Sequence, residues 1–525
     1  MKTRNILLTI AALALLASCT GKFAEISSDH YNAHNPEMTQ DNLMVGALFQ
    51  QMERSVIIYS DGTYLDSDYQ IMYNLNADTW CGYMGSTLAN SNGAHNTGWD
   101  VYDGWHRRMF TVKYEYGMAA FSNIKEFCEK NNLPLQLALA TVVKVATMHQ
   151  VTDYYGPIAY SKTGSVSGNV YDSQEDVYKA FFDELDSAIE ALEPYALSGT
   201  KLLEDYDIVY SGDVTKWIQF ANSLRLRLAM RVVYADAELA KAEAEKSIAS
   251  AVGVITGNDG NAVVQGVDHH PALEINVNFN EADTQMGASM DCYLNGYNDP
   301  RKFLIAKPAA GDGALHGVRA GINPSDWNPY KNPAGKVSAP NAAKYKICWL
   351  NAAEVAFLRA EGAVRGWEMG GTAKSFYEQG ITLSFEEWGA EGVASYIANS
   401  TAQPAAFTDN VGSANASKPS SVTIAWSESA SLEQKLAKIG TQKWIALFPN
   451  GCEAWAEYRR LHYPALIQPV NNFSNGIVNS NQQIRRVPYP VSEQSDNPDG
   501  YASGVAALGG ADNAGTRLWW DQKPF

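Results

Sequence analysis

The chain has 525 residues, of which 46% are hydrophobic and 18% are charged, with 13 Trp and 28 Tyr. This composition is typical of a globular protein and excludes a largely disordered chain. The net charge of −17 argues against nucleic acid as a partner, because phosphate binding needs clustered Lys and Arg side chains.

The N-terminal stretch is typical of a bacterial lipoprotein signal. A short cationic head precedes an apolar run over 6–17, which is too short to span a bilayer as a helix. The run ends in LASC at 16–19, which matches the lipobox, where the bond before the cysteine is cut and the thiol is acylated. We predict that residues 1–18 are removed and that Cys19 carries palmitate or similar acyl chains. These chains anchor a protein to a membrane that it does not span. The alternative is an ordinary signal peptide with an incidental cysteine.

Helical patterning begins after a polar, aperiodic stretch. We interpret residues 19–38 as a lipidated tether and residues 39–525 as a single domain. Apolar residues recur at helical spacing over 39–54. The stretch from 133 to 150 is largely apolar and has Pro134 in its first turn, which predicts a deeply buried helix.

Two further helices have recognisable starts. Ser173 and Asp213 each offer a side-chain oxygen that caps a following helix. An apolar stripe follows Ser173. The helix after Asp213 directs its apolar residues inward, so we expect Arg225, Arg227 and Arg231 to face elsewhere.

A second helical block runs from about 345 to 461. Two helical stretches flank a Gly-Gly turn and form an antiparallel pair, with Glu361 and Arg365 at i and i+4 on the first. Ser431 and Gln434 predict a capping box for a later helix. Paired helices of this kind resemble degenerate tetratricopeptide repeats (TPR), although no strict period is visible. The predicted fold is therefore mainly α, with a TPR-like scaffold of helical pairs.

Long irregular segments separate and follow these blocks. Segments of this length in a compact protein usually carry function. We expect a few short strands within them, at 253–255 and 262–265. The segments are 60–105, 252–345, 391–430 and 465–525.

The sequence gives no positive sign of catalysis, because HExxH, GxSxG and Walker motifs are all absent. Glycoside hydrolysis stays an open alternative. It needs only two carboxylates at a set distance from each other in the fold, and the sequence does not give that distance. Five cysteines besides Cys19 have no CxxC spacing, so we expect isolated thiols without a disulfide framework. They are Cys81, Cys128, Cys292, Cys348 and Cys452.

We expect no cofactor, although two clusters contain metal-ligand types. His269, His270 and Glu274 lie close in sequence, but adjacent loop histidines more often face solvent or form hydrogen bonds. A second cluster offers hard oxygen ligands for calcium without EF-hand spacing, and the alternative is an ordinary acidic turn. Its members are Asp61, Asp66 and Asp68.

Aromatic residues are dense in the irregular segments. Exposed rings stack on the apolar faces of sugars or on peptide side chains, with nearby Asp and Asn giving directional hydrogen bonds. The alternative is that the rings pack between loops and helices. The candidate ligand contacts are Trp80, Tyr83, Trp99, Tyr102, Trp327 and Tyr330.

Several stretches together resemble a known family. HQVTDYYGPIAYS at 149–161, GDVTKWIQFANSLRLRLAMRV at 212–232, YNDPRKF at 297–303 and RRVPYPVSEQSDN at 485–497 are similar to segments of the SusD/RagB family of Bacteroidetes outer-membrane lipoproteins. The QKWIALF block and the length of the first segments resemble the SusD-like, starch-binding-associated branch. With the lipobox, these segments span nearly the whole mature chain in the right order.

The resemblance implies a TPR-like scaffold with a loop-built binding face and no enzymatic activity. It implies a SusC-like TonB-dependent β-barrel as partner, over which the protein closes as a lid. Ligands of the family are mostly glycans, with peptides in the RagB branch, and its members share no fixed ligand residues. The resemblance implies a lipid-anchored outer-membrane protein. A run of acidic residues often directs such lipoproteins to the outer face, and here only Glu25 and Asp29 follow Thr20 as acidic residues. A peptide-binding protein, a surface glycoside hydrolase and a structural adaptor are the alternatives.

Overall fold

The computed structural model describes residues 42–59, 66–86, 96–163, 169–278, 284–323, 330 and 335–525. The predicted signal sequence, the tether and Cys19 lie outside them. In chain order the elements are α4 (Leu43–Val56), α5 (Asp66–Tyr69), η2 (Gln70–Ala77), α6 (Asp78–Trp80), β1 (Met84–Ser86), η3 (Asn96–Gly98), α7 (Asp103–Val112), η4 (Lys113–Met118), α8 (Ala119–Asn131), α9 (Pro134–Tyr155), α10 (Gln174–Leu192), η5 (Glu193–Tyr195), α11 (Val214–Arg231), α12 (Ala237–Ala249), η6 (Asn258–Gly260), α13 (Pro271–Asn278), β2 (Thr284–Met286), α14 (Ala288–Gly296), α15 (Lys302–Ile305), η8 (Ala342–Lys344), α16 (Ala352–Val364), α17 (Ala373–Trp388), α18 (Val393–Ile397), α19 (Leu432–Leu447), α20 (Gly451–Leu461), α21 (Glu493–Asp496) and α22 (Pro498–Leu508).

Helix α9 is the buried helix that the sequence predicts. It has Pro134 at its start and continues to Tyr155, five residues beyond the predicted end. From Ala138 onward nearly every side chain is buried, because α4, α8 and α10 pack around it. Gly156 ends the helix with a φ of 93°, a conformation that residues with a Cβ rarely adopt.

The two predicted helix caps are confirmed. Ser173 Oγ accepts a hydrogen bond from the N–H of Asp176 at 3.1 Å, at the start of α10. Asp213 Oδ1 accepts one from the N–H of Lys216 at 3.1 Å, at the start of α11. Each bond satisfies one of the backbone donors that a helix start leaves free.

The prediction that the arginines of α11 face away from the core is wrong. Arg225 and Arg227 are 3% exposed and Arg231 is 0% exposed. Helices α10, α12, α16 and α20 all contact α11, so the helix has little solvent-facing surface. Each guanidinium is instead paired with a carboxylate of another helix, as buried charges require. The pairs are Arg225 with Asp186, Arg227 with Glu354, and Arg231 with Glu453.

The second helical block forms the predicted antiparallel pair. Helices α16 and α17 pack closely, and the absence of a side chain at Gly380 of α17 allows this, because an added Cβ would lie only 2.8 Å from the ring of Phe357. The Glu361–Arg365 pair is confirmed, with 2.8 Å between Oε1 and Nη2. The capping box of α19 is also confirmed, since Ser431 and Gln434 exchange side-chain and backbone hydrogen bonds.

Two short strands lie within the irregular segments, as expected, but not at the predicted positions. Strands β1 and β2 form an antiparallel pair with Met84 opposite Met286. The prediction of strands at 253–255 and 262–265 is wrong, because the second segment makes only an isolated bridge, between Val263 and Cys348. The irregular segments also hold short helices, such as α13, α14 and α22, that their polar, Gly-rich composition did not predict.

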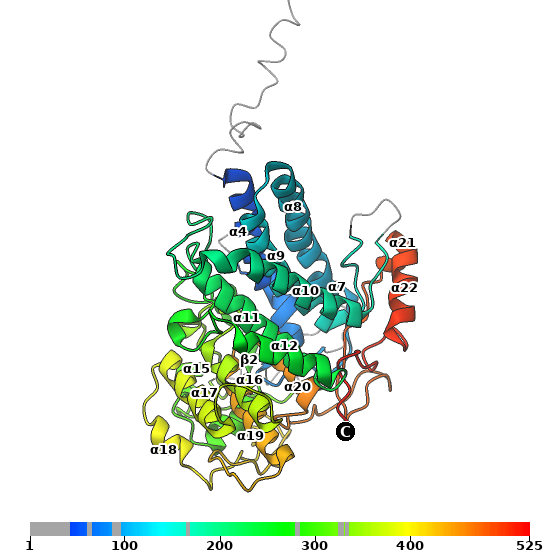
Figure 1. The fold of residues 1–525 in the computed structure, drawn as a ribbon. Helices are drawn as coiled ribbons and strands as arrows, with labels where there is room; N and C mark the ends of the chain where they lie inside the picture. Colours follow the sequence, from blue (N-terminus) through cyan, green and yellow to red (C-terminus); the bar gives the residue numbers. More distant parts are fainter. Residues whose placement is uncertain are drawn as a thin grey trace, which may run out of the picture.

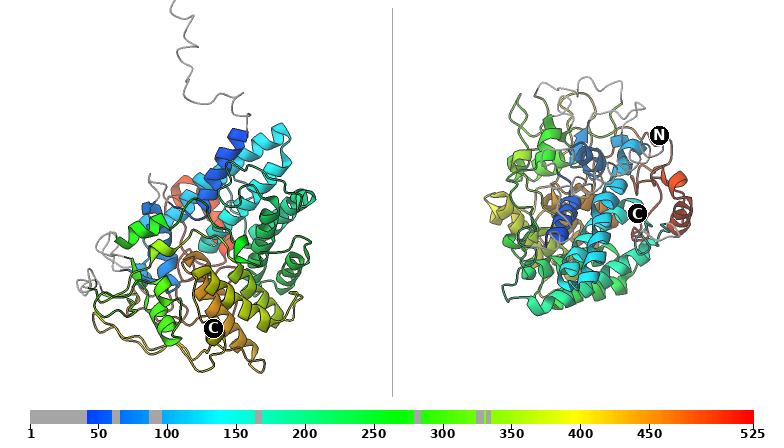
Figure 2. Two further views of the ribbon diagram at one scale, coloured as in Figure 1. Left: turned by 90° about the vertical axis from the view of Figure 1, so that its left-hand side faces the viewer. Right: turned by 90° about the horizontal axis from the view of Figure 1, so that it is seen from above.

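The helices succeed one another side by side in a curved arrangement. Contacts join α4 and α8 to α9, α9 to α10, α10 to α11, α11 to α16, and α16 to α17 and α19 (Figure 1). Figure 2 shows, on the left, the long helices on one side and irregular segments gathered on the other. The mainly α prediction is confirmed. Most buried apolar side chains of the described residues form one continuous core. The boundaries 1–18, 19–38 and 39–525 stay predictions.

Candidate functional site

Most of the aromatic side chains predicted to contact ligand are buried. Trp80 and Trp99 are 3% exposed, Tyr83 is 0% exposed and Tyr330 is 4% exposed. The expectation that these four rings stand exposed in loops is wrong for this structure. Tyr102 is half-buried, with its ring perpendicular to that of Trp105, and Trp327 lies outside the described residues. A role of these rings in ligand binding stays a prediction.

The burial of Trp80 and Tyr83 follows from the position of their segment against α19 and α20. Trp80 Nε1 donates to the carbonyl oxygen of Asn96 at 3.1 Å, and its ring lies 4.9 Å from that of Trp455. The ring of Tyr83 packs between those of Trp444 and Phe448, at 5.1 and 5.0 Å. These rings therefore pack in the interface between their own segment and helices α19 and α20.

Two of the candidate aromatic residues nevertheless line one small cavity between irregular segments. Trp80 and Trp99 line it together with Val318, Leu466 and Pro469. Its volume is about 20 Å³, which suits a water molecule and is too small for a sugar ring.

Buried hydrogen bonds join Tyr330 to the irregular segment around Asp409. The Tyr330 hydroxyl donates to Asp409 Oδ2 at 2.5 Å, and the same carboxylate accepts N–H groups of Val411, Gly412 and Ala414. Desolvation raises the pKa of Asp409, but these hydrogen bonds outweigh it and the pKa lies below its ordinary value. The turn around Asp409 is therefore locked to Tyr330.

Arg319 ties three irregular segments together. Its Nε donates to the carbonyl oxygen of Gln468 at 2.7 Å, and its Nη1 donates to that of Asn415 at 2.9 Å. Carbonyl groups, not carboxylates, thus hold this guanidinium, and desolvation lowers its pKa. These hydrogen bonds hold the segments around Arg319, Asn415 and Gln468 together.

The described side chains of the two predicted metal clusters either lie apart from one another or form ion pairs and hydrogen bonds with other groups. Asp68 forms a bidentate pair with Arg108, at 2.6 and 2.8 Å. Asp61 and the side chain of Asp66 lie outside the described residues, so calcium at this cluster stays a prediction. No group of three His, Cys, Asp or Glu side chains in the described ranges is arranged to hold a metal ion.

The two histidines of the other cluster point to different surroundings. His269 pairs with Glu274 at 3.1 Å on the surface. His270 is buried, and its Nδ1 accepts the N–H of Leu273 at the start of α13. Burial lowers the pKa of His270 to about 3, so its ring stays neutral at physiological pH. The five described cysteines are free thiols, as predicted.

A second and larger cavity lies where the helical layers meet the irregular segments. Its volume is about 310 Å³, at the lower end of the range for small-molecule sites. It is enclosed by η2, the segment before α13, residues 344–351, the end of α17 and the turn between α19 and α20. Aromatic walls come from Tyr69, Tyr73, Tyr345, Trp388 and Phe448, and polar groups come from Asn258, Asn261, Asn351, Glu386 and Glu387.

Glu387 is the unusual side chain of this cavity. Its carboxylate is accessible but surrounded by protein, and burial raises its pKa to about 7. Asn351 Nδ2 donates to its Oε2 at 3.0 Å, and Asn261 Nδ2 lies 3.5 Å from its Oε1. These amides hold the carboxylate in place without neutralising its charge.

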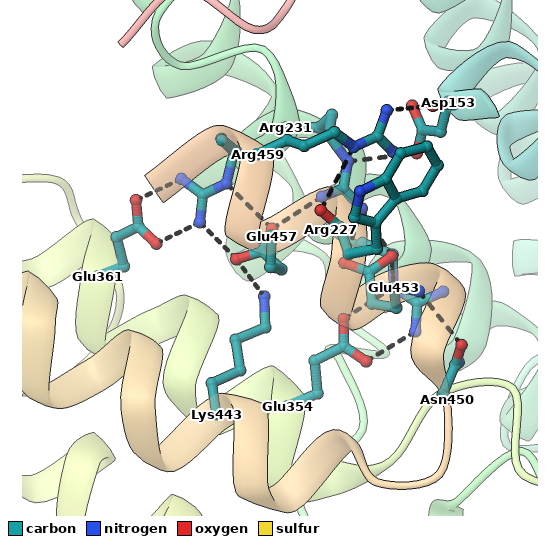
Figure 3. Close-up of polar contacts among 12 residues, drawn as sticks. Asp153, Arg227, Arg231, Glu354, Glu361, Lys443, Asn450, Glu453, Glu457 and Arg459 are labelled. Atoms are coloured by element: carbon teal, nitrogen blue, oxygen red, sulfur yellow. Dashed lines mark hydrogen bonds and ion pairs between the residues drawn. The ribbon is translucent and has the colours of Figure 1, made fainter. Parts of the chain in front are cut away.

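A network of buried charges adjoins the cavity through Glu354, and Figure 3 shows its polar contacts. Glu354, which also lines the cavity, forms a bidentate pair with Arg227 at 2.7 and 2.6 Å. Glu453 and Glu457 pair in turn with Arg231, at 2.6 and 2.9 Å. Although desolvation raises it, these cations bring the pKa of Glu453 down to about 2. The network therefore stays charged at neutral pH and connects α11, α16 and α20.

Sequence reasoning did not find this cavity. The only local signal is the FEEWG stretch at 385–389, where two acidic residues precede a Trp at the end of an amphipathic helix. The other lining groups come from segments as far away in sequence as Ile57, more than 300 residues before this stretch, and nothing in their local patterns connects them.

Comparisons with known proteins define the family. The family model for SusD-like proteins, described as Susd and RagB outer membrane lipoprotein, matches residues 25–521. A chitin-binding SusD homolog from Flavobacterium johnsoniae is 38% identical with a TM-score of 0.86, covering 91% of this chain and 99% of its own. A SusD homolog from Bacteroides uniformis is also 38% identical with a TM-score of 0.85, covering 92% of this chain and 100% of its own. A third, from Bacteroides vulgatus, is 34% identical with a TM-score of 0.85, covering 91% and 98%. No curated protein matches the chain.

These likenesses confirm the predicted TPR-like scaffold and the predicted localisation at the outer membrane. Within the described ranges, no helix combines the length and the apolar character needed to cross a bilayer. The chain belongs to the SusD-like family of SusD and RagB outer-membrane lipoproteins.

Proposed function

We propose that the protein captures oligosaccharides at the cell surface and delivers them to a SusC-like TonB-dependent β-barrel, over which it closes as a lid. The observation that carries the proposal is the likeness to the chitin-binding homolog, at 38% identity over 91% of this chain. Acyl chains on Cys19 hold the protein beside the barrel. The irregular face meets the ligand and the TPR-like helices contact the barrel.

The fixed loop surface supports capture by binding. The hydrogen bonds of Asp409 and Arg319 order the loops in advance, so less conformational entropy is lost when a ligand binds. Release then depends on movement of the lid relative to the barrel. A ligand shifts the equilibrium between an open and a closed lid only if it binds one of these states more tightly than the other. Such a cycle needs no bond-breaking chemistry.

Calorimetric titration of the acyl-free protein against a glycan panel, with chitin oligosaccharides included, tests the ligand class. We expect at least one oligosaccharide to bind, and a matched peptide panel to give no heat. Binding of peptides alone contradicts the glycan proposal and supports the RagB-like alternative.

Purification from membranes in mild detergent tests the partner. We expect a TonB-dependent β-barrel to co-purify with the wild-type protein. A structural adaptor without ligand is the competing explanation, and it requires that no oligosaccharide or peptide binds while the barrel still co-purifies.

Prolonged incubation with the bound glycan tests for hydrolysis. The family resemblance supports a binding protein, so we expect no new reducing ends. Their appearance, together with loss of the activity after substitution of a carboxylate, supports the glycoside hydrolase alternative.

A further inference from the structure

The two longest uncharged runs of the sequence meet in the irregular part of the molecule. Residues 461–484 and 79–99 contain no Asp, Glu, Lys or Arg, although 18% of the whole chain is charged. Of the second run the structure describes 79–86 and 96–99. We propose that the segment 470–481, which we call the finger, contacts an uncharged oligosaccharide through its exposed amide and apolar side chains. The inference rests on the proposed function and adds the ligand class and the residues that contact the ligand.

The two runs pack against each other, so their lack of charge belongs to one place in the fold. The N–H of Phe473 in the finger donates to the carbonyl oxygen of Gly98 at 2.7 Å. The N–H of Val470 donates to the carbonyl oxygen of Ala320 at 2.8 Å. Side chains of both runs also line the small cavity that contains Trp80. The base of the finger is therefore joined to two other irregular segments.

The tip of the finger presents uncharged groups to solvent. Asn475, Asn479 and Asn481 are exposed, and Ile477 is 53% exposed. The side-chain amides of Asn475 and Asn481 form no hydrogen bond to another described residue, so both are available to a ligand. An amide offers two donors and an acceptor, which match the hydroxyl groups of a sugar. An aliphatic side chain such as that of Ile477 covers the apolar face of a sugar ring.

Hydrogen bonds inside the finger hold its tip in one shape. Asn472 Nδ2 donates to the carbonyl oxygen of Val478 at 2.8 Å and to Ser480 Oγ at 3.0 Å. Ser474 Oγ accepts the N–H of Val478 at 2.9 Å. Because these bonds order the segment in advance, a ligand that binds it causes a smaller loss of conformational entropy than it would at an unordered loop.

Backbone strain is concentrated in the same two runs. Of the ten non-glycine residues with a positive φ in the described ranges, four belong to these runs, which are a small part of those ranges. Trp99 has a φ of 69° and Gln483 has a φ of 62°, and both line the small cavity. The other two are His462 and Asn475. A left-handed backbone costs free energy at residues with a Cβ, and it is found mainly at segments that bind ligands or substrates.

The absence of charge determines the kind of sugar that fits. An acidic or sulfated sugar needs a Lys or Arg partner, and an amino sugar needs a carboxylate, because a covered charge without a partner is costly. Arg319 lies at the base of the finger, but its guanidinium already donates to the carbonyl oxygens of Gln468 and Asn415. Arg485, which follows the longer run, is buried and paired with Asp521. An uncharged sugar at the tip covers no charged group that would lose its hydration.

Calorimetric titration of the acyl-free protein with uncharged and charged tetrasaccharides tests the ligand class. The uncharged probes are tetraacetylchitotetraose, cellotetraose and maltotetraose, and the charged probes are deacetylated chitotetraose and tetragalacturonate. We expect at least one uncharged probe to bind, and both charged probes to bind at least tenfold more weakly than the best uncharged one. The cationic probe is a strict comparison, because the net charge of −17 attracts it at long range.

The double variant Asn475→Asp/Asn481→Asp tests the residues. Each change keeps the shape of the side chain, removes an amide donor and adds a negative charge. We expect the affinity for the best uncharged probe to fall at least tenfold. The matched control is Asn131→Asp/Asn132→Asp at the end of α8, which adds the same charge at two exposed positions, and Asn132 has the same φ of 54° as Asn475. The control should leave the affinity within about twofold, and thermal unfolding checks that both variants are folded.

Three outcomes overturn the inference: a charged probe that binds most tightly, an unchanged affinity for the uncharged probe in the folded finger variant, or no binding of any probe. The first two leave the proposed capture of oligosaccharides standing, because a glycan still binds. After the third, the wider glycan panel decides separately whether the proposed function fails as well, so the two failures are distinguishable.

Discussion

Arg227 of α11 and Glu354 of α16 form a bidentate ion pair in the core, with Nε–Oε1 and Nη2–Oε2 distances of 2.7 and 2.6 Å. The two residues are 127 positions apart and are 3% and 0% exposed. Arg227 Nη2 also donates to the carbonyl oxygen of Trp349 at 2.8 Å. One guanidinium thus joins α11 to the start of α16 and to the segment before it, and the last two of these line the larger cavity.

Substitution Arg227→Met tests how much this pair stabilises the fold. The change leaves the Glu354 carboxylate buried without its main cation, and the loss of one partner of a buried pair costs about 3–5 kcal/mol. We expect the free energy of unfolding, measured by urea denaturation and circular dichroism, to fall by that amount.

The control for this variant is Lys179→Met. Lys179 pairs with Glu175 at 2.6 Å on the exposed surface of α10, where solvent screens the charges, so we expect its loss to change the free energy of unfolding little. An equal effect of the two substitutions contradicts the view that the buried network holds the helices together.

The arginines of α11 show a limit of sequence reasoning. The helix start at Asp213 was predictable, because a cap depends on residues within one turn. The burial of Arg225, Arg227 and Arg231 was not, because their partners lie on helices far along the chain, such as α16 and α20. A mixed apolar and basic helix gives the same local pattern whether its charges meet water or distant carboxylates.

Substitution Ser431→Ala tests the capping box of α19. The change removes the acceptor for the N–H of Gln434, which then has no capping partner at the helix start. We expect the free energy of unfolding to fall by about 1 kcal/mol, as for other Ser caps. Urea denaturation measures it.

Ser429→Ala is the matched control, since Ser429 is exposed and lies outside the helix. We expect its effect to be well below that of Ser431→Ala. A loss of the same size in both variants means that the hydroxyl of Ser431 has no special role as a cap.

The aromatic residues show a second limit. Dense Trp and Tyr in polar segments indicated a binding surface, yet Trp80 and Tyr83 are packed against α19 and α20. The chain brings these helices to the loop only in three dimensions, so composition could not separate an exposed ring from a buried one. The cavity beside Glu387 was not predictable for the same reason, because its lining comes from segments between η2 and α20 that meet only in the folded chain.

Asp78 links stability to pH. Its side chain is 0% exposed and accepts a hydrogen bond from Asn74 Nδ2 at 2.7 Å, and burial raises its pKa from 3.8 to about 7. The folded state therefore binds the proton more tightly than the unfolded state between these values. Its contribution to stability is most favourable at low pH, declines as pH rises from about 4 to about 7, and stays unfavourable above that.

Substitution Asp78→Asn removes this titration. We expect the free energy of unfolding of the wild-type protein to fall more between about pH 5 and about pH 8 than that of Asp78→Asn, as measured by urea denaturation. The exposed Asp205→Asn serves as control and should follow the wild-type protein. Identical pH profiles for Asp78→Asn and the wild-type protein contradict the assignment.

Membrane attachment through Cys19 is the prediction on which the cellular role depends. Substitution Cys19→Ser removes the thiol that acyl chains modify, and each buried methylene of such a chain contributes about 0.8 kcal/mol to membrane binding. In cells grown with labelled palmitate, we expect the wild-type protein to carry label and to enter the membrane fraction. Cys19→Ser should do neither. Ser18→Ala keeps a small residue before the cysteine and should behave as the wild-type protein does. Retention of Cys19→Ser in the membrane fraction without label means that another segment or a partner holds the protein there, since acyl chains are then not the anchor.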